Sequence, residues 1–274
     1  MRIKSWLKNL FVLSPIIFSL DLFDGEKFLH AVVLTFAFCL ISSAIYVLND
    51  MSDVENDRKH EVKKNRPIAA GLISLPRARL LLACLTIGGF GLALVINFSS
   101  FLLMLVYVVT NILYSKWLKK KPIIDCFCIA LGFLLRVMVG GTIVSAGISG
   151  WMFLTVLALS LFMAFGKRRG ELRSYVGGET RTVLEDYDLS FLNGIVFMCA
   201  GLTMVFYSLW SISQESNLVY SVPIVLFIVI RYLYLVFKGR ADADPTTLIL
   251  SDATLMISCG ICGIMMVAML YWPL

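Results

Sequence analysis

The chain has 274 residues and a formal net charge of +6; 59% of its residues are hydrophobic and only 15% are charged. Charged residues make up roughly a quarter of a soluble globular protein, so this composition indicates an integral membrane protein. It argues against a water-soluble enzyme, a disordered tail or a nucleic-acid-binding module. The apolar stretches are continuous rather than alternating, which excludes an outer-membrane β-barrel.

Nine apolar runs approach the roughly 20 residues that a helix needs to cross the hydrocarbon core. The first is the least regular, because it contains Pro15 and ends among aspartates. In chain order the runs are 7–23, 29–48, 80–98, 101–114, two within 123–166 separated by a turn near 147–150, 189–214, 218–237 and 253–274. We therefore expect an all-α integral membrane protein with one transmembrane domain over residues 1–274.

The charges of the predicted loops are distributed unequally between the two sides. On one side lie 21 of the 24 Lys and Arg residues, whereas Lys27 is alone on the other side, and Arg136 and Arg231 fall within spans. The positive-inside rule then predicts a multi-pass protein of the cell (inner) membrane with a cytoplasmic N-terminus and an external C-terminus. The net charge is explained by this topology and needs no nucleic-acid partner.

Two predicted cytoplasmic segments, residues 49–76 and 166–190, hold ten of the eighteen acidic residues. In the first, Asp50, Asp53 and Asp57 are spaced i, i+3 and i+7, which places them on one face of a helix. Such carboxylates repel one another, and a helix C-terminus disfavours anions, so a cation is expected. Mg²⁺ suits this place because it takes oxygen ligands and shares them with phosphates. The alternative is a solvated acidic turn neutralised by nearby basic residues.

Basic residues follow directly, among them Lys59, Lys64 and Arg66. Arg binds phosphate through a planar fork and Lys supplies a movable point charge, so these residues suit the outer oxygens of a metal-bound diphosphate. The signal is weak by itself, since topology also requires basic loops here. His60 stands in the same loop, where a lone His is more often a surface residue than a metal ligand.

Two charged residues lie inside the predicted fifth span. Asp125 and Arg136 are costly in hydrocarbon, so they should face the bundle interior and either pair or bind substrate. They stand eleven residues apart, which allows one helix face. In the alternative, Asp125 lies at the membrane interface and Arg136 is a structural tie. Arg231 is more readily explained as structural or as snorkelling to the interface.

The pattern Asn49-Asp50-x-x-Asp53-x-x-x-Asp57, followed by Arg66-Pro67-Ile68 and a small-residue turn ending in Gly, resembles the UbiA superfamily of intramembrane prenyltransferases. The resemblance implies nine transmembrane helices around a central cavity, with cytoplasmic cap loops after helices 2 and 6. Acidic motifs on these caps would bind Mg²⁺ and a diphosphate. The resemblance also makes Asn49 and Tyr114 candidate substrate-binding residues, since Asn49 begins the motif and the family often has a Tyr-Ser pair near its site.

The second cap departs from the commonest family pattern, a clean Asp-x-x-x-Asp. Here the sequence is Gly-Lys-Arg-Arg-Gly-Glu-Leu at 166–172, so acid is partly exchanged for base. Together with Arg-Pro-Ile-Ala-Ala-Gly at 66–71 and Gly-Phe-Leu-Leu-Arg at 132–136, it resembles the branch that transfers 5-phosphoribose from phosphoribosyl diphosphate to decaprenyl phosphate. That substrate set carries a diphosphate, a 5-phosphate and a lipid phosphate, which explains the additional cations.

The resemblance implies a Mg²⁺-dependent phosphoribosyltransferase acting on a polyprenyl (decaprenyl) phosphate. The catalytic and metal-binding residues would be Asp50, Asp53 and Asp57. The substrate-binding residues would be Asn49, Lys59, Lys64, Arg66, Tyr114, Asp125, Arg136, Lys167, Arg168 and Glu171. One alternative is a prenyltransferase that moves an allylic group from its diphosphate to an aromatic or other lipid-soluble acceptor. Another is a non-catalytic transporter or lipid-binding protein, although the chain lacks an evident inverted repeat. A homo-oligomer is compatible with the sequence, which does not determine the oligomeric state.

Overall fold

The computed structural model describes residues 3–59, 63–145, 147–173, 182–214, 217–239 and 245–272. Every regular element in these residues is helical. The α-helices are α1 (Ser14–Phe18), α2 (Gly25–Ser52), α3 (Val54–Lys59), α4 (Leu75–Ile96), α5 (Phe98–Lys116), α6 (Ile124–Gly141), α7 (Gly150–Arg173), α8 (Leu189–Ser213), α9 (Val222–Phe237), α10 (Pro245–Ser251) and α11 (Ala253–Tyr271). The 3-10 helices are Ile3–Leu13, Lys63–Asn65, Leu118–Lys120, Thr182–Leu184 and Asn217–Ser221.

Eight helical stretches in the described residues are long and apolar enough to cross a membrane. They coincide with eight of the nine runs expected from the sequence. The first run contains only a shorter apolar helical stretch, Ser5–Phe18. Pro15 is the second residue of α1, a place in the first turn where proline fits because its missing N–H would have no partner in the helix. The count of nine spans and the central cavity stay predictions.

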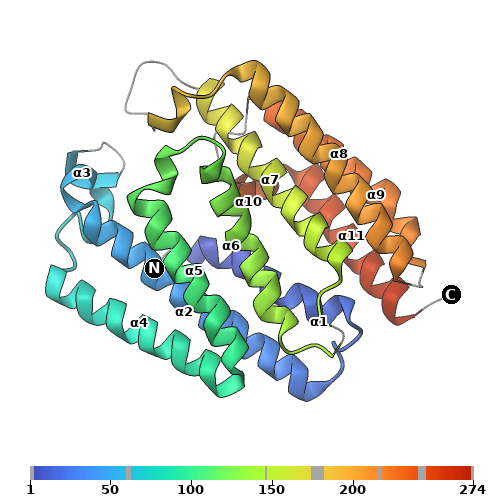
Figure 1. Cartoon of the computed structure of the whole chain (residues 1–274), viewed down its shortest axis with the longest axis horizontal. Helices are drawn as coiled ribbons and strands as arrows, with labels where there is room; N and C mark the ends of the chain where they lie inside the picture. The colour runs from blue at the N-terminus through green and yellow to red at the C-terminus, as the bar shows by residue number, and fades with distance from the viewer. Residues whose placement is uncertain are drawn as a thin grey trace. The chain divides into compact units, whose positions relative to one another are not determined.

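The Cα positions divide the chain into two compact units, whose elements can be followed by colour in Figure 1. The first unit comprises Met1–Ile16, Leu22–Ser115 and Leu135–Val144. The second comprises Ile17–Asp21, Lys116–Leu134 and Ser145–Leu274. The expectation of a single transmembrane domain stays a prediction.

In the first unit, α2 packs along α4, and the 3-10 helix Ile3–Leu13 packs on α2. Trp6 donates a hydrogen bond from its indole nitrogen to Ser43 Oγ on α2 at 3.1 Å. Gly140 on α6 allows close backbone approach, since a Cβ at this position would collide with the carbonyl oxygen of Val12. Small residues at such contacts are typical of membrane helix packing, where helices associate through close van der Waals contact.

In the second unit, α7 packs against α8 and α9, and α11 packs against α9. Two arginines near the end of α7 bind the last carbonyls of α9, groups that have no partner within their own helix. Arg169 Nη1 donates to Val236 O at 2.9 Å, and Arg173 Nη1 donates to Phe237 O at 2.6 Å. The buried Arg169 also binds Asn193 Oδ1 on α8 at 2.7 Å. These basic residues therefore hold three helices together.

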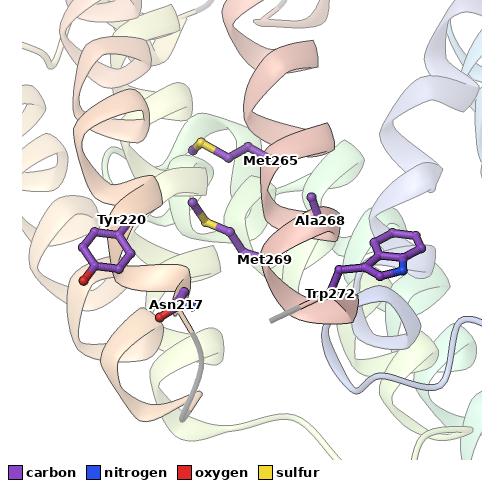
Figure 2. Close-up of a pocket in the computed structure, with 6 residues that line it drawn as sticks. All are labelled: Asn217, Tyr220, Met265, Ala268, Met269 and Trp272. Carbon is purple, nitrogen blue, oxygen red and sulfur yellow. The ribbon is translucent and has the colours of Figure 1, made fainter. Parts of the chain in front are cut away.

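A cavity of about 590 Å³ lies between the 3-10 helix Asn217–Ser221 and the end of α11 (Figure 2). Its lining residues are Asn217, Tyr220, Met265, Ala268, Met269 and Trp272. None of these six residues carries a charge. The described lining of this cavity therefore lacks the cations that phosphate groups require.

Candidate active site

The first charged cluster is formed by the end of α2 and by α3. Asp53 lies between the two helices with φ −100° and ψ 10°. Its N–H donates to Asn49 O at 2.9 Å, and its carbonyl accepts from Asp57 N at 2.8 Å, so helical spacing continues across the break. The predicted helix through this motif is thus interrupted at Asp53, while Asp50 and Asp57 still point to a common partner.

That partner is Arg66. Its Nη1 lies 3.1 Å from Asp50 Oδ1 and 2.6 Å from Asp57 Oδ2. The Asp57 side chain is only 4% exposed, whereas Arg66 is 26% exposed. A buried carboxylate needs a cation or hydrogen-bond donors nearby, because burial removes it from water. The cation that the sequence argument required is therefore supplied here by the chain itself.

Arg66 is positioned by a folded turn rather than by an extended loop. Ile68 is buried in a core with Ala44 and Val47 of α2, and Ala70 N donates to Arg66 O at 2.8 Å. Gly71 ends the turn with a φ of +74°, a conformation that glycine adopts without a steric penalty. The sequence Arg-Pro-Ile-Ala-Ala-Gly thus directs one guanidinium at the aspartates.

Other predicted residues lie around this cluster. Ser115 Oγ at the end of α5 donates to Asn49 Oδ1 at 2.9 Å, and the preceding residue, Tyr114, is half-buried. Lys59 and Lys64 are exposed. Within the described residues, no three His, Cys, Asp or Glu side chains lie together closely enough to hold a metal ion. The first cluster therefore brings together two of the three predicted carboxylates. His60 falls outside the described residues.

The second charged cluster joins α6 and α7. Arg168 Nε lies 2.5 Å from Asp125 Oδ2, and Arg168 Nη1 lies 2.6 Å from Glu171 Oε2. The Asp125 side chain is fully buried and that of Arg168 is 1% exposed. The sequence predicted that Asp125 and Arg168 bind substrate. In the structure, the guanidinium of Arg168 instead pairs with the carboxylates of Asp125 and Glu171.

At the accessible end of this cluster, the Lys167 side chain is 25% exposed and that of Glu171 is 18% exposed. Lys167 Nζ lies 4.0 Å from Glu171 Oε1. Of the three substrate-binding residues predicted on α7, these two therefore retain access to a ligand.

Tyr187 is the member of the second cluster that the sequence did not indicate. Its hydroxyl donates to Asp125 Oδ1 at 2.8 Å and accepts from Ile123 N at 2.6 Å. Burial raises the pKa of Tyr187, so the phenol remains a neutral hydrogen-bond donor. Tyr187 stands between Asp186 and Asp188, and no motif in the sequence distinguishes it as a site residue.

Arg136, on the part of α6 that belongs to the first unit, is 7% exposed. Its Nε donates to Asn9 Oδ1 at 2.9 Å and its Nη2 to Tyr107 OH at 3.1 Å. The rings of Phe38 and Tyr107 each lie 4.9 Å from the guanidinium carbon, within cation–π range. The substrate role of Arg136 stays a prediction.

Arg231, which the sequence suggested was structural, forms a two-point pair with Asp252. Its Nε and Nη2 lie 3.2 and 2.8 Å from the two carboxylate oxygens. Asp252 also accepts a hydrogen bond from Leu255 N at the start of α11. Arg231 thereby connects α9 to the N-terminus of α11.

The profile of the UbiA prenyltransferase family matches residues 12–257, most of the chain. The chain belongs to the UbiA family. Among its curated relatives, the decaprenyl-phosphate phosphoribosyltransferase of Corynebacterium glutamicum is 34% identical, over 94% of this chain and 81% of that protein. The protein of the same name from Mycolicibacterium smegmatis is 31% identical, over 93% of this chain and 86% of that protein.

A solved structure shows the same fold. The UbiA homolog from Archaeoglobus fulgidus bound to GPP and Mg²⁺ superimposes with a TM-score of 0.70 at 18% identity, covering 95% of this chain and 97% of that one. At this identity the likeness concerns the fold alone. This UbiA family member is therefore a multi-pass, all-helical membrane protein with the UbiA fold, as the sequence predicted.

Proposed function

We propose that this UbiA family member transfers 5-phosphoribose from 5-phosphoribosyl 1-diphosphate to a polyprenyl (decaprenyl) phosphate. The bond between the anomeric carbon and the diphosphate oxygen breaks, and the diphosphate leaves with the electron pair. A lipid phosphate oxygen forms the new bond to that carbon. This acceptor is already anionic at neutral pH, so no general base is needed. The likeness to decaprenyl-phosphate phosphoribosyltransferases along 94% of the chain carries this proposal.

The first cluster has the chemistry of a magnesium site. Asp50 and Asp57 already converge on one cationic nitrogen. Carboxylate oxygens are the ligands that Mg²⁺ prefers, and it commonly uses one or two of them together with substrate phosphates and water. We assign Asp50 and Asp57 as its ligands, with Asp53 and Asn49 as further oxygen donors. When bound there, Mg²⁺ would neutralise the negative charge that grows on the departing diphosphate.

The basic residues of the chain complete this neutralisation. With Mg²⁺ held by the aspartates, the guanidinium of Arg66 would bind the diphosphate oxygens through its fork. Lys59 and Lys64 are exposed beside it and can bind outer phosphate oxygens. These positive charges stabilise the transition state more than the bound substrate, because the leaving group becomes more negative as the bond breaks.

The second cluster offers further groups that would bind substrate. Lys167 is partly exposed and would bind a phosphate group, and Glu171 would accept hydrogen bonds from the ribose hydroxyls. Arg168 acts differently in this assignment, because its contacts with Asp125 and Glu171 make it the residue that orients Glu171. Tyr114, Asp125 and Arg136 remain proposed members of the substrate site.

The identity of the donor tests the proposal directly. Detergent-purified protein with Mg²⁺ would receive either ribose-labelled phosphoribosyl diphosphate with polyprenyl phosphate, or labelled prenyl diphosphate with hydroxybenzoate. We expect ribose label in the lipid extract, at a level that depends on both the acceptor and Mg²⁺. Label transferred only from the prenyl donor would overturn the proposal in favour of an ordinary prenyltransferase.

We also propose that the N-terminus and residues 49–76 are cytoplasmic, in a cell (inner) membrane, with the C-terminus outside. The unequal distribution of Lys and Arg carries this orientation. Single cysteines can replace Lys27 and Lys120 in a variant whose seven native cysteines are changed to alanine. A membrane-impermeant maleimide should label position 27 in intact cells and position 120 only after permeabilisation. Equal labelling of both positions in intact cells would contradict the orientation.

A further inference from the structure

The start of α6 is held in a strained conformation. Ile123 precedes the helix with a φ of +69°. This left-handed region is unfavourable for a β-branched residue and is uncommon outside glycine. Residues of this kind persist only where their surroundings fix them, and they gather at functional sites. Here the N–H of Ile123 donates to the hydroxyl of Tyr187 at 2.6 Å. Tyr187 thus fixes the strained residue from which α6 begins.

A single path of polar contacts leads from Tyr187 across α6 to α7. The Tyr187 hydroxyl donates to Asp125 Oδ1 at 2.8 Å, and Arg168 Nε lies 2.5 Å from Asp125 Oδ2. Both oxygens of the buried carboxylate are therefore engaged. Arg168 Nη1 then donates to Glu171 Oε2 at 2.6 Å. The guanidinium is a rigid plane, so fixing its Nε also fixes the direction in which Nη1 points.

Access to the surface changes along this path. The side chain of Asp125 is fully buried, that of Arg168 is 1% exposed, and that of Glu171 is 18% exposed. Tyr187 itself is 7% exposed. One Glu171 oxygen is held by Arg168, while the other lies 4.0 Å from the partly exposed Lys167. The path therefore begins at a buried phenol and ends at a carboxylate that a ligand can reach.

We propose that Tyr187 is a positioning residue for donor binding, which holds Glu171 in place through Asp125 and Arg168. This inference rests on the proposed role of Glu171 toward the ribose of the donor. Tyr187 need not touch any substrate. Its hydroxyl holds one oxygen of the buried Asp125 carboxylate while Arg168 holds the other, which gives the carboxylate a single favoured orientation.

The Tyr187→Phe variant tests the proposal, because it removes only the hydroxyl and keeps the ring. We expect the Michaelis constant for the donor to rise about fivefold to tenfold, as the loss of a fraction of one charge-assisted contact implies. The turnover number and the Michaelis constant for the lipid acceptor should each change by less than about threefold. Tyr207→Phe is the matched control, since Tyr207 is a second buried tyrosine of the same unit, hydrogen-bonded to Ser221. It should leave the donor constant unchanged.

A double-mutant cycle with Glu171→Gln separates positioning from a general structural role. If Tyr187 acts through Glu171, the double variant should bind the donor no more weakly than Glu171→Gln alone. Independent effects that multiply would overturn the inference. A donor constant unchanged in Glu171→Gln would instead remove the proposed function of Glu171. If Glu171→Gln raises the donor constant but Tyr187→Phe leaves it as unchanged as Tyr207→Phe does, only the role of Tyr187 is refuted.

If Tyr187→Phe does not fold, the double variant Tyr187→Phe/Ile123→Gly tests the positioning role instead. Adding Ile123→Gly relieves the strained backbone, because glycine adopts a positive φ without a side-chain clash. We expect the combined variant to fold while its donor constant stays raised, since Asp125 still lacks the phenol donor. A normal donor constant in that folded variant would contradict the positioning role.

Discussion

Replacing Asp50 or Asp57 with alanine is expected to lower turnover by about a hundredfold or more, the cost of removing one group that stabilises transition-state charge. Each substitution removes a proposed metal ligand and one of the two carboxylates that hold Arg66. The fold should survive, because membrane helices are held together by packing and internal hydrogen bonds. The measurement is turnover per folded molecule at saturating Mg²⁺.

Glu55→Ala is the matched control for these variants. Glu55 is an acidic residue of the same segment, but its side chain is 76% exposed and it pairs only weakly with the exposed Arg58. Surface ion pairs of this kind contribute little to stability, so this variant should behave as the native protein. Near-normal turnover of both Asp50→Ala and Asp57→Ala would refute the proposed magnesium site.

Neutralising Lys167 is expected to weaken donor binding by about tenfold to a hundredfold, the equivalent of one charge-assisted phosphate contact. Its side chain is partly exposed, so Lys167→Gln should have little effect on stability. The Michaelis constant for the lipid acceptor should change less, because its phosphate is expected to bind elsewhere. The Michaelis constant of the donor, measured in purified protein, is the readout. An unaltered constant would transfer donor binding to the first cluster and restore the ordinary prenyltransferase alternative.

Arg168→Gln is expected to have a different outcome from Lys167→Gln. Breaking a buried ion pair by removing one partner costs about 3 to 5 kcal/mol, because an uncompensated charge remains in the interior. Asp125 would be that charge. We therefore expect a large loss of thermal stability and a weakened donor affinity in the fraction that folds. Arg173→Gln, a change of the same type at an exposed residue of α7, should leave the donor constant unchanged.

The positions of Asp50, Asp57 and Arg66 show how far sequence reasoning reaches into the site. Helical periodicity placed the two aspartates correctly relative to each other, because their spacing is set within one nearly continuous stretch of helix. Arg66 was identified as a basic residue of the site, but its pairing with both aspartates could not be read from spacing. That contact depends on a turn whose position is set by Ile68 in a core with α2.

Hydropathy and charge by themselves determined the membrane class, eight of the spans and the expected sides of the loops, because each property is local to a run of about 20 residues. The contacts among Asp125, Arg168 and Tyr187 were decided only by the tertiary structure. These residues come from α6, from α7 and from the segment before α8, and they meet through side-chain contacts across more than 40 residues of sequence. A buried charge must find its partner wherever packing brings one, and no local pattern specifies which residue that is.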